Sequence, residues 1–192
     1  DDTLLINDVP HTMDQVRNKI NGKCLLQARV SQHPEMNTLN PHSVNCLRVI
    51  TARKQDQIVP LSALLKVGSS KSPCDNWAAG GVIVGADLQS GELSEYGFYK
   101  MGYGKKIAEQ PETRVRFKEF KIPYFHECID VVRRLHEYFY GLHSIGWDIA
   151  VSEEGPMILE GNDRWDTQMQ QVHDVRLKRK FLDTLPSADG GR

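Results

Sequence analysis

The sequence lacks an excess of basic residues, and it lacks any long apolar run. Lys and Arg number 24 against 25 Asp and Glu, so the formal net charge is -1. General nucleic-acid and membrane-surface binders carry a basic excess, which this chain does not have. No segment approaches the length of a membrane span or of a signal-peptide core. We therefore expect a cytoplasmic protein without nucleic-acid or membrane partners.

Cysteines are few, and they are far apart in the sequence. Cys24, Cys46, Cys74 and Cys128 form no CxxC pair and have no His nearby at zinc-ligand spacing. A chain of 192 residues can bury a substantial core without a disulfide or a structural metal. We expect these residues to be buried thiols in a reduced compartment.

The most informative segment is 146–162, which reads as a β-hairpin. The turn signal Glu154-Gly155-Pro156 divides two short apolar runs. If pairing is centred near the turn, Asp148 lies opposite Glu160. Asn162 then shares the face of Glu160, because side chains on a strand repeat every two residues. The hairpin is therefore expected to place two carboxylates and one amide oxygen on one face.

These three oxygen donors predict a divalent metal site. Neighbouring carboxylates repel each other unless a cation lies between them, and all-oxygen ligation suits Mg²⁺ or Mn²⁺ rather than Zn²⁺. The alternative is an exposed acidic hairpin whose carboxylates only keep a strand soluble. The metal site is favoured because apolar neighbours predict a buried hairpin, where unpaired carboxylates are costly. These neighbours are Trp147, Ile149, Val151, Ile158 and Leu159.

Hydrophobic periodicity and turn residues predict an α+β fold, with an antiparallel sheet flanked by helices. Strands are expected over residues 23–30, 44–51, 58–67, 82–88 and 92–98, in addition to the hairpin. A loop containing Pro34 and Pro41 is expected after the first strand. Helices are expected over residues 12–20, over the apolar pattern of 128–142, and over 167–185. The tail 186–192 is expected to be frayed.

Five phrases of the sequence, in this order, resemble the ATP-grasp superfamily and, within it, the sugar-transfer-associated branch. They are 45–51 (NCLRVIT), 75–81 (DNWAAGG), 110–113 (QPET), 121–124 (KIPY) and 146–162, which carries an Asp followed by Glu-x-Asn. By this resemblance, the hairpin would bind ATP together with Mg²⁺ (or Mn²⁺). Asp148, Glu160 and Asn162 would hold the metal ions that bridge the β- and γ-phosphates.

The same resemblance assigns Arg48 to catalysis, where it would contact the transferred phosphate or an acyl-phosphate. A guanidinium on a buried strand is suited to planar, bidentate binding of an oxyanion. The alternative for Arg48 is a structural salt bridge.

The resemblance also implies an adenine site and substrate contacts. The strand containing Gln27, Ala28 and Val30 resembles the family's hinge, where the backbone reads the adenine edge, and Leu159 would pack beneath the purine. A core strand and a core leucine explain these residues equally well. Two further residues, Asn76 and Arg164, are implied to face the acceptor substrate. An ordinary turn also explains the former, and the Pro common in the family near the latter is absent here.

ATP-grasp enzymes clamp ATP between two lobes, and nothing before Lys23 resembles the glycine-rich loop of the earlier lobe. We therefore expect residues 1–192 to form a single domain, the C-terminal lobe, in a fragment without the preceding lobe. A start at Asp1 without an initiator Met agrees with this expectation.

The implied activity is that of an ATP-dependent ligase acting on a small-molecule carboxylate and an amine or similar nucleophile. Such chemistry needs no nucleophilic side chain, and the sequence offers no Ser-His-Asp or Cys-His arrangement. One alternative is a non-catalytic nucleotide-binding or interaction module that retains the fold. Another is a hydrolase using Asp148 and Glu160 as acid and base, but directly paired positions are too close for an inverting enzyme.

Overall fold

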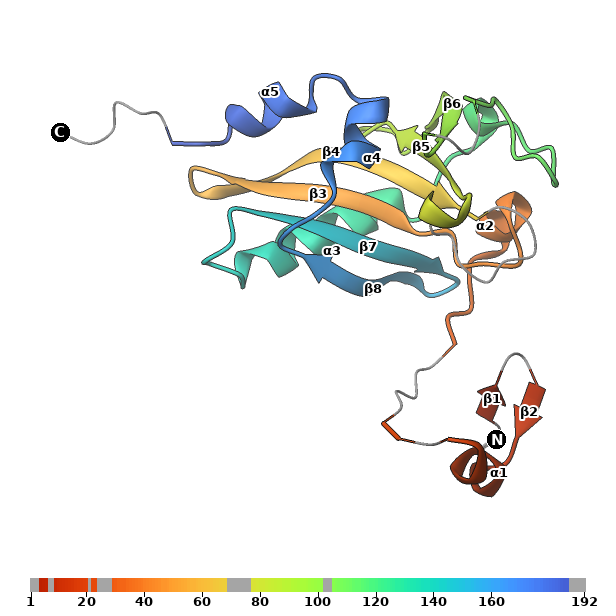
Figure 1. Cartoon of the computed structure of the whole chain (residues 1–192). Helices are drawn as coiled ribbons and strands as arrows, with labels where there is room; N and C mark the ends of the chain where they lie inside the picture. Colours follow the sequence, from red (N-terminus) through yellow and green to blue (C-terminus); the bar gives the residue numbers. More distant parts are fainter. Residues whose placement is uncertain are drawn as a thin grey trace.

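The computed structural model describes residues 4–6, 9–20, 22–23, 29–68, 77–101 and 105–186. Its centre is an antiparallel sheet of six strands in the order β6-β5-β4-β3-β7-β8, which confirms the expected α+β class (Figure 1). The strands are β3 (Leu47–Lys54), β4 (Gln57–Val67), β5 (Val82–Ala86), β6 (Leu93–Tyr99), β7 (Ser144–Ser152) and β8 (Gly155–Asn162).

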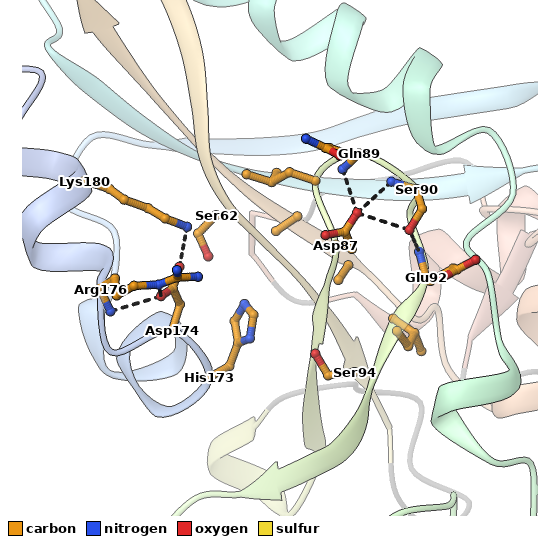
Figure 2. A pocket seen from close by; sticks show the side chains of 14 residues that line it. Ser62, Asp87, Gln89, Ser90, Glu92, Ser94, His173, Asp174, Arg176 and Lys180 are labelled. Atoms are coloured by element: carbon orange, nitrogen blue, oxygen red, sulfur yellow. Dashed lines mark hydrogen bonds and ion pairs between the residues drawn. The ribbon is translucent and has the colours of Figure 1, made fainter.

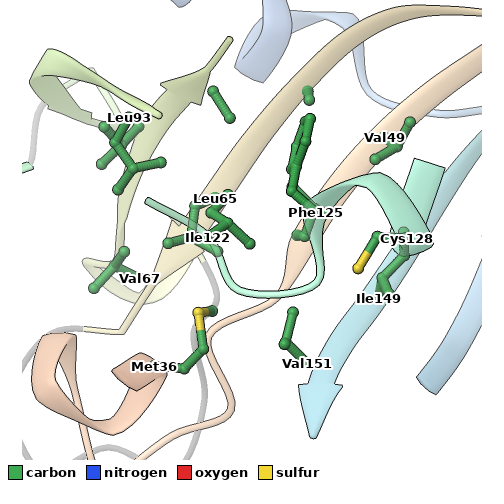
Figure 3. Close-up of a cluster of buried hydrophobic side chains, with 14 of the residues drawn as sticks. Met36, Val49, Leu65, Val67, Leu93, Ile122, Phe125, Cys128, Ile149 and Val151 are labelled. Carbon is green, nitrogen blue, oxygen red and sulfur yellow. The ribbon is translucent and has the colours of Figure 1, made fainter. Parts of the chain in front are cut away.

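The helix α3 (Phe125–Glu137) covers one face of the sheet and builds the main core (Figure 3). Leu47, Val49, Leu65 and Ile149 point to this face and are 0 % exposed. Because side chains alternate along a strand, the residues between them point to the opposite face. The functional side chains discussed below lie on that opposite face.

The second face carries α4 (Thr167–His173) and α5 (Leu177–Leu182), which pack on β4 and β5. The helical region expected over 167–185 is confirmed, but it is divided into two helices because α4 ends at Asp174. The carboxylate of Asp174 accepts a hydrogen bond from the backbone N–H of Arg176, at 3.0 Å, and this local bond replaces the helical pattern.

A short helix, α2 (Pro34–Leu39), replaces the loop expected around Pro34. Proline is well suited to the first position of a helix, and His33 Nδ1 accepts a hydrogen bond from the N–H of Glu35 at 3.2 Å. Met36 and Leu39 are fully buried. The expected loop is therefore wrong at Pro34, where proline begins a helix, and it is confirmed at Pro41, which lies in an irregular segment.

The segment before the sheet contains β1 (Leu4–Ile6), β2 (Val9–His11) and α1 (Met13–Lys19). The expected helix over 12–20 is confirmed, and a capping box between Thr12 and Gln15 begins it. In Figure 1 this unit lies apart from the six-stranded sheet. Residues 24–28 of the expected first strand and 187–192 of the expected tail lie outside the described residues.

The remaining expected strands are confirmed with shifted ends, and two short 3₁₀ helices are present as well, η1 (Trp77–Ala79) and η2 (Phe117–Glu119). The helix expected over the apolar pattern of 128–142 is shorter than that pattern, because α3 ends at Glu137. No helix within the described ranges is long and apolar enough to cross a membrane.

A buried histidine in the core forms hydrogen bonds through both ring nitrogens. Trp147 Nε1 donates to Thr51 Oγ1 at 2.8 Å, and the same hydroxyl forms a hydrogen bond with His136 Nδ1 at 2.7 Å. The other ring nitrogen, Nε2, donates to the carbonyl of Leu142 at 3.1 Å. Nε2 of His136 therefore carries a proton, and burial, which lowers the pKa of the ring, favours the neutral imidazole.

We expect the free energy of unfolding to fall as the pH is lowered from 7.5 to 5.5. Burial, helped by the charges of Arg53 and His143, lowers the pKa of His136 in the folded state. The unfolded chain therefore takes up a proton below its ordinary pKa of about 6.5 while the folded chain resists it, which costs up to about 1.4 kcal/mol per pH unit. Burial lowers the pKa of His173 as well, so that residue adds to the slope.

Urea unfolding at several pH values measures this slope. A His136→Gln variant should show a flatter dependence than the parent protein, whereas a variant at the exposed His126 should not. An equal slope in both variants would show that His136 is not the responsible group.

Candidate functional site

The predicted register of the hairpin is confirmed, since Asp148 pairs with Glu160 across β7 and β8. The turn lies one residue earlier than expected, at residues 153–154. Gly155 follows it with a φ of 116°, a conformation that favours glycine. Pro156 therefore belongs to β8 rather than to the turn.

A β-bulge at Leu159 gives the hairpin its two different faces. Ile149 pairs with Ile158, and the preceding Asp148 pairs with Glu160, so Leu159 is the extra residue in β8. Without this bulge, Ile158 and Glu160 would point to the same face. With it, Ile158 packs on the α3 core while Glu160 turns to the side of Asp148.

Arg48 on β3 completes a row of three facing residues, because β3 pairs with β7 and places Arg48 opposite Asp148. The ion pair is bidentate. Arg48 Nε lies 2.5 Å from Asp148 Oδ1, and Arg48 Nη2 lies 2.7 Å from Asp148 Oδ2. The two side chains are only 7 % and 6 % exposed. The salt bridge considered as the alternative for Arg48 is therefore present.

The structure adds Lys66, which the sequence analysis did not identify. Leu65 points to the α3 core, so its neighbour Lys66 on β4 points to the face of Arg48. Lys66 Nζ lies 3.1 Å from Asp148 Oδ2, and the lysine side chain is 13 % exposed. The available sequence signal was a lone charge in the otherwise uncharged strand segment 61–67.

The two cations keep Asp148 ionised. Burial by itself would raise the pKa of this carboxyl, but the hydrogen bond from Arg48 and the charges of Lys66 and Arg48 outweigh burial and lower it. Burial by itself would lower the pKa of Arg48. The hydrogen bond and the charge of Asp148, together with the charge of Glu160, outweigh burial and raise this pKa. Asp148 and Arg48 are therefore both ionised throughout the neutral pH range.

Glu160 and Asn162 lie at the open side of this row. Asn162 Nδ2 donates to Glu160 Oε1 at 3.0 Å, which leaves the amide oxygen of Asn162 facing away from that bond. The Glu160 side chain is 57 % exposed, and its Oε1 lies 3.9 Å from Arg48 Nη2.

The donor chemistry fits Mg²⁺ or Mn²⁺, because two carboxylates and an amide oxygen are hard oxygen ligands. Among the described residues, no three His, Cys, Asp or Glu side chains lie close enough to hold a metal ion. The third protein ligand would therefore be the amide oxygen of Asn162.

Trp165 closes the same face beside Asn162. Gly146 lies opposite Asn162 in the sheet, and a Cβ added to Gly146 would lie 2.6 Å from the Cβ of Trp165. The indole Nε1 donates to Ser144 Oγ at 3.1 Å, which fixes the ring over the strand. The glycine of the Gly-Trp-Asp phrase is thus explained by this close approach.

The other predicted site residues lie outside the row of Arg48, Asp148 and Glu160, and some of them lie outside the described part of the chain. Leu159 is 36 % exposed at the bulge, next to Glu160, and Arg164 is exposed in the turn after β8. Val30 is half-buried, in a segment that reaches the end of β7, where the N–H of His33 donates to the carbonyl of Val151 at 2.9 Å. Three predicted residues lie outside the described part of the chain, namely Gln27, Ala28 and Asn76.

A cavity of about 750 Å³ lies between the β5–β6 turn and the α4–α5 connection (Figure 2). Four of its charged residues, Asp87, Asp174, Arg176 and Lys180, are already held by ion pairs or hydrogen bonds. Asp174 forms ion pairs with Arg176 and Lys180, and Asp87 Oδ1 accepts hydrogen bonds from the backbone N–H groups of Gln89 and Ser90. None of the residues of the Arg48–Asp148 row lines this cavity. We therefore read it as part of the packing of α5 rather than as the functional site.

Replacing Asp174 by Ala should lower the free energy of unfolding by about 2 kcal/mol. The carboxylate is 9 % exposed, pairs with Lys180, and accepts the N–H of Arg176 at the start of α5. Chemical denaturation measures the loss. Asp183→Ala, at the exposed end of the same helix, is the matched control, and an equal loss in both variants would contradict the assignment.

Comparison with known families and proteins matches this chain to one family. A family described as sugar-transfer associated ATP-grasp matches residues 13–183, which include every described residue of the row and its neighbours. No curated protein and no solved structure matches the chain. The matched span covers most of the 192 residues, and the chain therefore belongs to the sugar-transfer associated ATP-grasp family.

Proposed function

We propose that the protein is a magnesium-dependent ligase that uses ATP to activate a small-molecule carboxylate. Membership of the family indicates an ATP-binding, ligase-like protein. The single observation that carries the proposal is the row formed by Arg48, Asp148 and Glu160 on one sheet face, with Asn162 beside it. This row brings cationic groups for phosphate oxygens next to oxygen donors for a metal.

Asp148, Glu160 and Asn162 would hold the Mg²⁺, which supplies neutralisation of phosphate charge when it is bound. Arg48 and Lys66 would orient the transferred phosphoryl group through N–H bonds to its oxygens. A substrate carboxylate oxygen attacks the γ-phosphorus, and the bond to the β–γ bridging oxygen breaks to release ADP. An amine then attacks the acyl carbon, phosphate leaves with the C–O bond electrons, and the proton released by the amine ends on the departing phosphate. The side chains position these groups and form no covalent intermediate.

The remaining roles follow from position. Leu159 is apolar, partly exposed and adjacent to Glu160, so it is available to pack against the purine. Gln27, Ala28 and Val30 would contact the adenine edge, as the resemblance implies. Asn76 and Arg164 would contact the acceptor, and the exposed position of Arg164 just after β8 is compatible with that role.

A non-catalytic nucleotide-binding module is the second candidate. The observation that favours it is the pairing of Asp148 with both Arg48 and Lys66, which by itself is a stable structural arrangement. The two candidates differ in turnover, because the module would bind ATP without consuming it.

Trapping of an acyl-phosphate separates the two candidates. Incubation with ATP, Mg²⁺, pooled small carboxylic acids and hydroxylamine should release ADP and form a hydroxamate, because hydroxylamine replaces the unknown amine. Glu160→Gln should abolish the product, whereas Glu153→Gln, in the exposed turn of the same hairpin, should retain it. ATP binding without ADP release from any carboxylate in the pool would favour the module.

A further inference from the structure

Most hydrogen-bond acceptor positions of the Asp148 carboxylate are occupied by N–H groups of this chain. It accepts three N–H bonds, two from Arg48 and one from Lys66, with N–O distances of 2.5, 2.7 and 3.1 Å. An ionised carboxylate has about four acceptor positions, so little remains for a metal ion. All three side chains are largely buried, which limits the help that water can give in separating them.

The charge of the group points in the same direction. Arg48 and Lys66 are both cationic, and both contact the Asp148 carboxylate. A free dication that approached this carboxylate would lie close to two buried cations, which oppose its binding. A metal–triphosphate complex is net negative, and its phosphate oxygens can accept the N–H groups that now bind Asp148.

We infer that Arg48 and Lys66 prevent Asp148 from binding a free divalent cation, and that the site binds the metal only together with a polyphosphate anion. The anion draws the two cations from the carboxylate, and the carboxylate then becomes available to the metal. Lys66 is thus a positioning residue, which acts on the metal through Asp148. This inference rests on the proposed function, because it concerns the same metal-nucleotide site.

The test is a titration with Mn²⁺ alone, followed by the electron paramagnetic resonance signal of the unbound ion. The parent protein should bind Mn²⁺ weakly, in the millimolar range or above. Lys66→Met keeps the volume of the side chain but removes its charge, and it should bind Mn²⁺ at least tenfold more tightly. The added substitution Asp148→Asn should remove that gain, because the gain depends on the freed carboxylate.

Lys54→Met is the matched control, because Lys54 is an exposed lysine at the end of β3. It should behave like the parent protein. Circular dichroism verifies the fold of each variant, and Lys66→Gln replaces Lys66→Met if the latter does not fold. Equal Mn²⁺ affinity of the parent protein and the folded Lys66 variant would overturn the inference.

A second titration with Mn²⁺ and the non-hydrolysable analogue AMP-PNP separates this inference from the proposed function. The parent protein should bind Mn²⁺ at least tenfold more tightly with the analogue than without it. No binding of the analogue would contradict the proposed nucleotide site. The Mn²⁺ affinities of the parent protein and the Lys66 variant would still decide whether Lys66 prevents metal binding by Asp148, because that titration contains no nucleotide.

Discussion

Asp148→Asn should reduce the affinity of the protein for Mg²⁺-AMP-PNP roughly 100-fold, which corresponds to about 2.7 kcal/mol. The carboxylate is central in the row, bonded to Arg48 and Lys66 and paired with Glu160 across the hairpin. Asparagine has the same shape but no charge, so it would be a weaker metal ligand than the carboxylate and would hold neither cation strongly. Isothermal titration calorimetry measures the change.

Asp163→Asn is the control for this change, because Asp163 is exposed in the turn directly after β8. Its affinity should remain within about twofold of the parent value, since a surface charge is screened by solvent. If Asp148→Asn bound the analogue as tightly as Asp163→Asn, the metal-binding role of Asp148 would have to be abandoned.

Arg48→Met should lower the free energy of unfolding by about 3 kcal/mol, because it leaves the buried carboxylate of Asp148 with Lys66 as its remaining cationic partner. Arg114→Met removes an exposed ion pair with Glu109, at 2.6 Å, and should cost about 0.5 kcal/mol. Chemical denaturation of both variants measures the contrast between a buried and an exposed arginine.

A triple variant tests the cause of this loss. Arg48→Met combined with Asp148→Leu and Lys66→Met replaces the carboxylate and both of its cationic partners by apolar side chains, and it should recover at least half of the stability lost by Arg48→Met. A triple variant less stable than Arg48→Met would show that the loss comes from packing rather than from an unpaired charge.

The register of the functional hairpin was predictable because local chemistry determines it. Two apolar runs around a turn fix which residues face each other, and Asp148 does pair with Glu160. The bulge at Leu159 was not predicted. A bulge moves the turn by one residue and preserves the outer pairing, so the alternation of residues in the sequence could not locate it.

Lys66 was missed because its role depends on contacts across strands. Arg48 and Asp148 are 100 residues apart in the sequence, and Lys66 and Asp148 are 82 apart, so the strand order of the sheet brings the group together. Arg48 was identified only through its resemblance to a family phrase. Periodicity places a charged residue on a face, but it does not say which neighbouring strand carries its partner.

The departures from the expected helices have local causes. The apolar periodicity of 167–185 continues through Asp174, where a side-chain bond to the backbone N–H of Arg176 ends α4. The apolar pattern after α3 likewise continues to Leu142, because that residue packs on the core from a turn. Periodicity reports burial in both cases, and burial alone does not require a helix.

The central claim is that this face of the sheet binds ATP through a metal held by Asp148, Glu160 and Asn162. Calorimetric titration of AMP-PNP, with Mg²⁺ and then with the metal chelated by EDTA, tests it most directly. We expect saturable binding with one nucleotide per chain when Mg²⁺ is present, and at least tenfold weaker binding without it. Binding of equal strength in both conditions, or no binding by the folded protein in either, would contradict the claim.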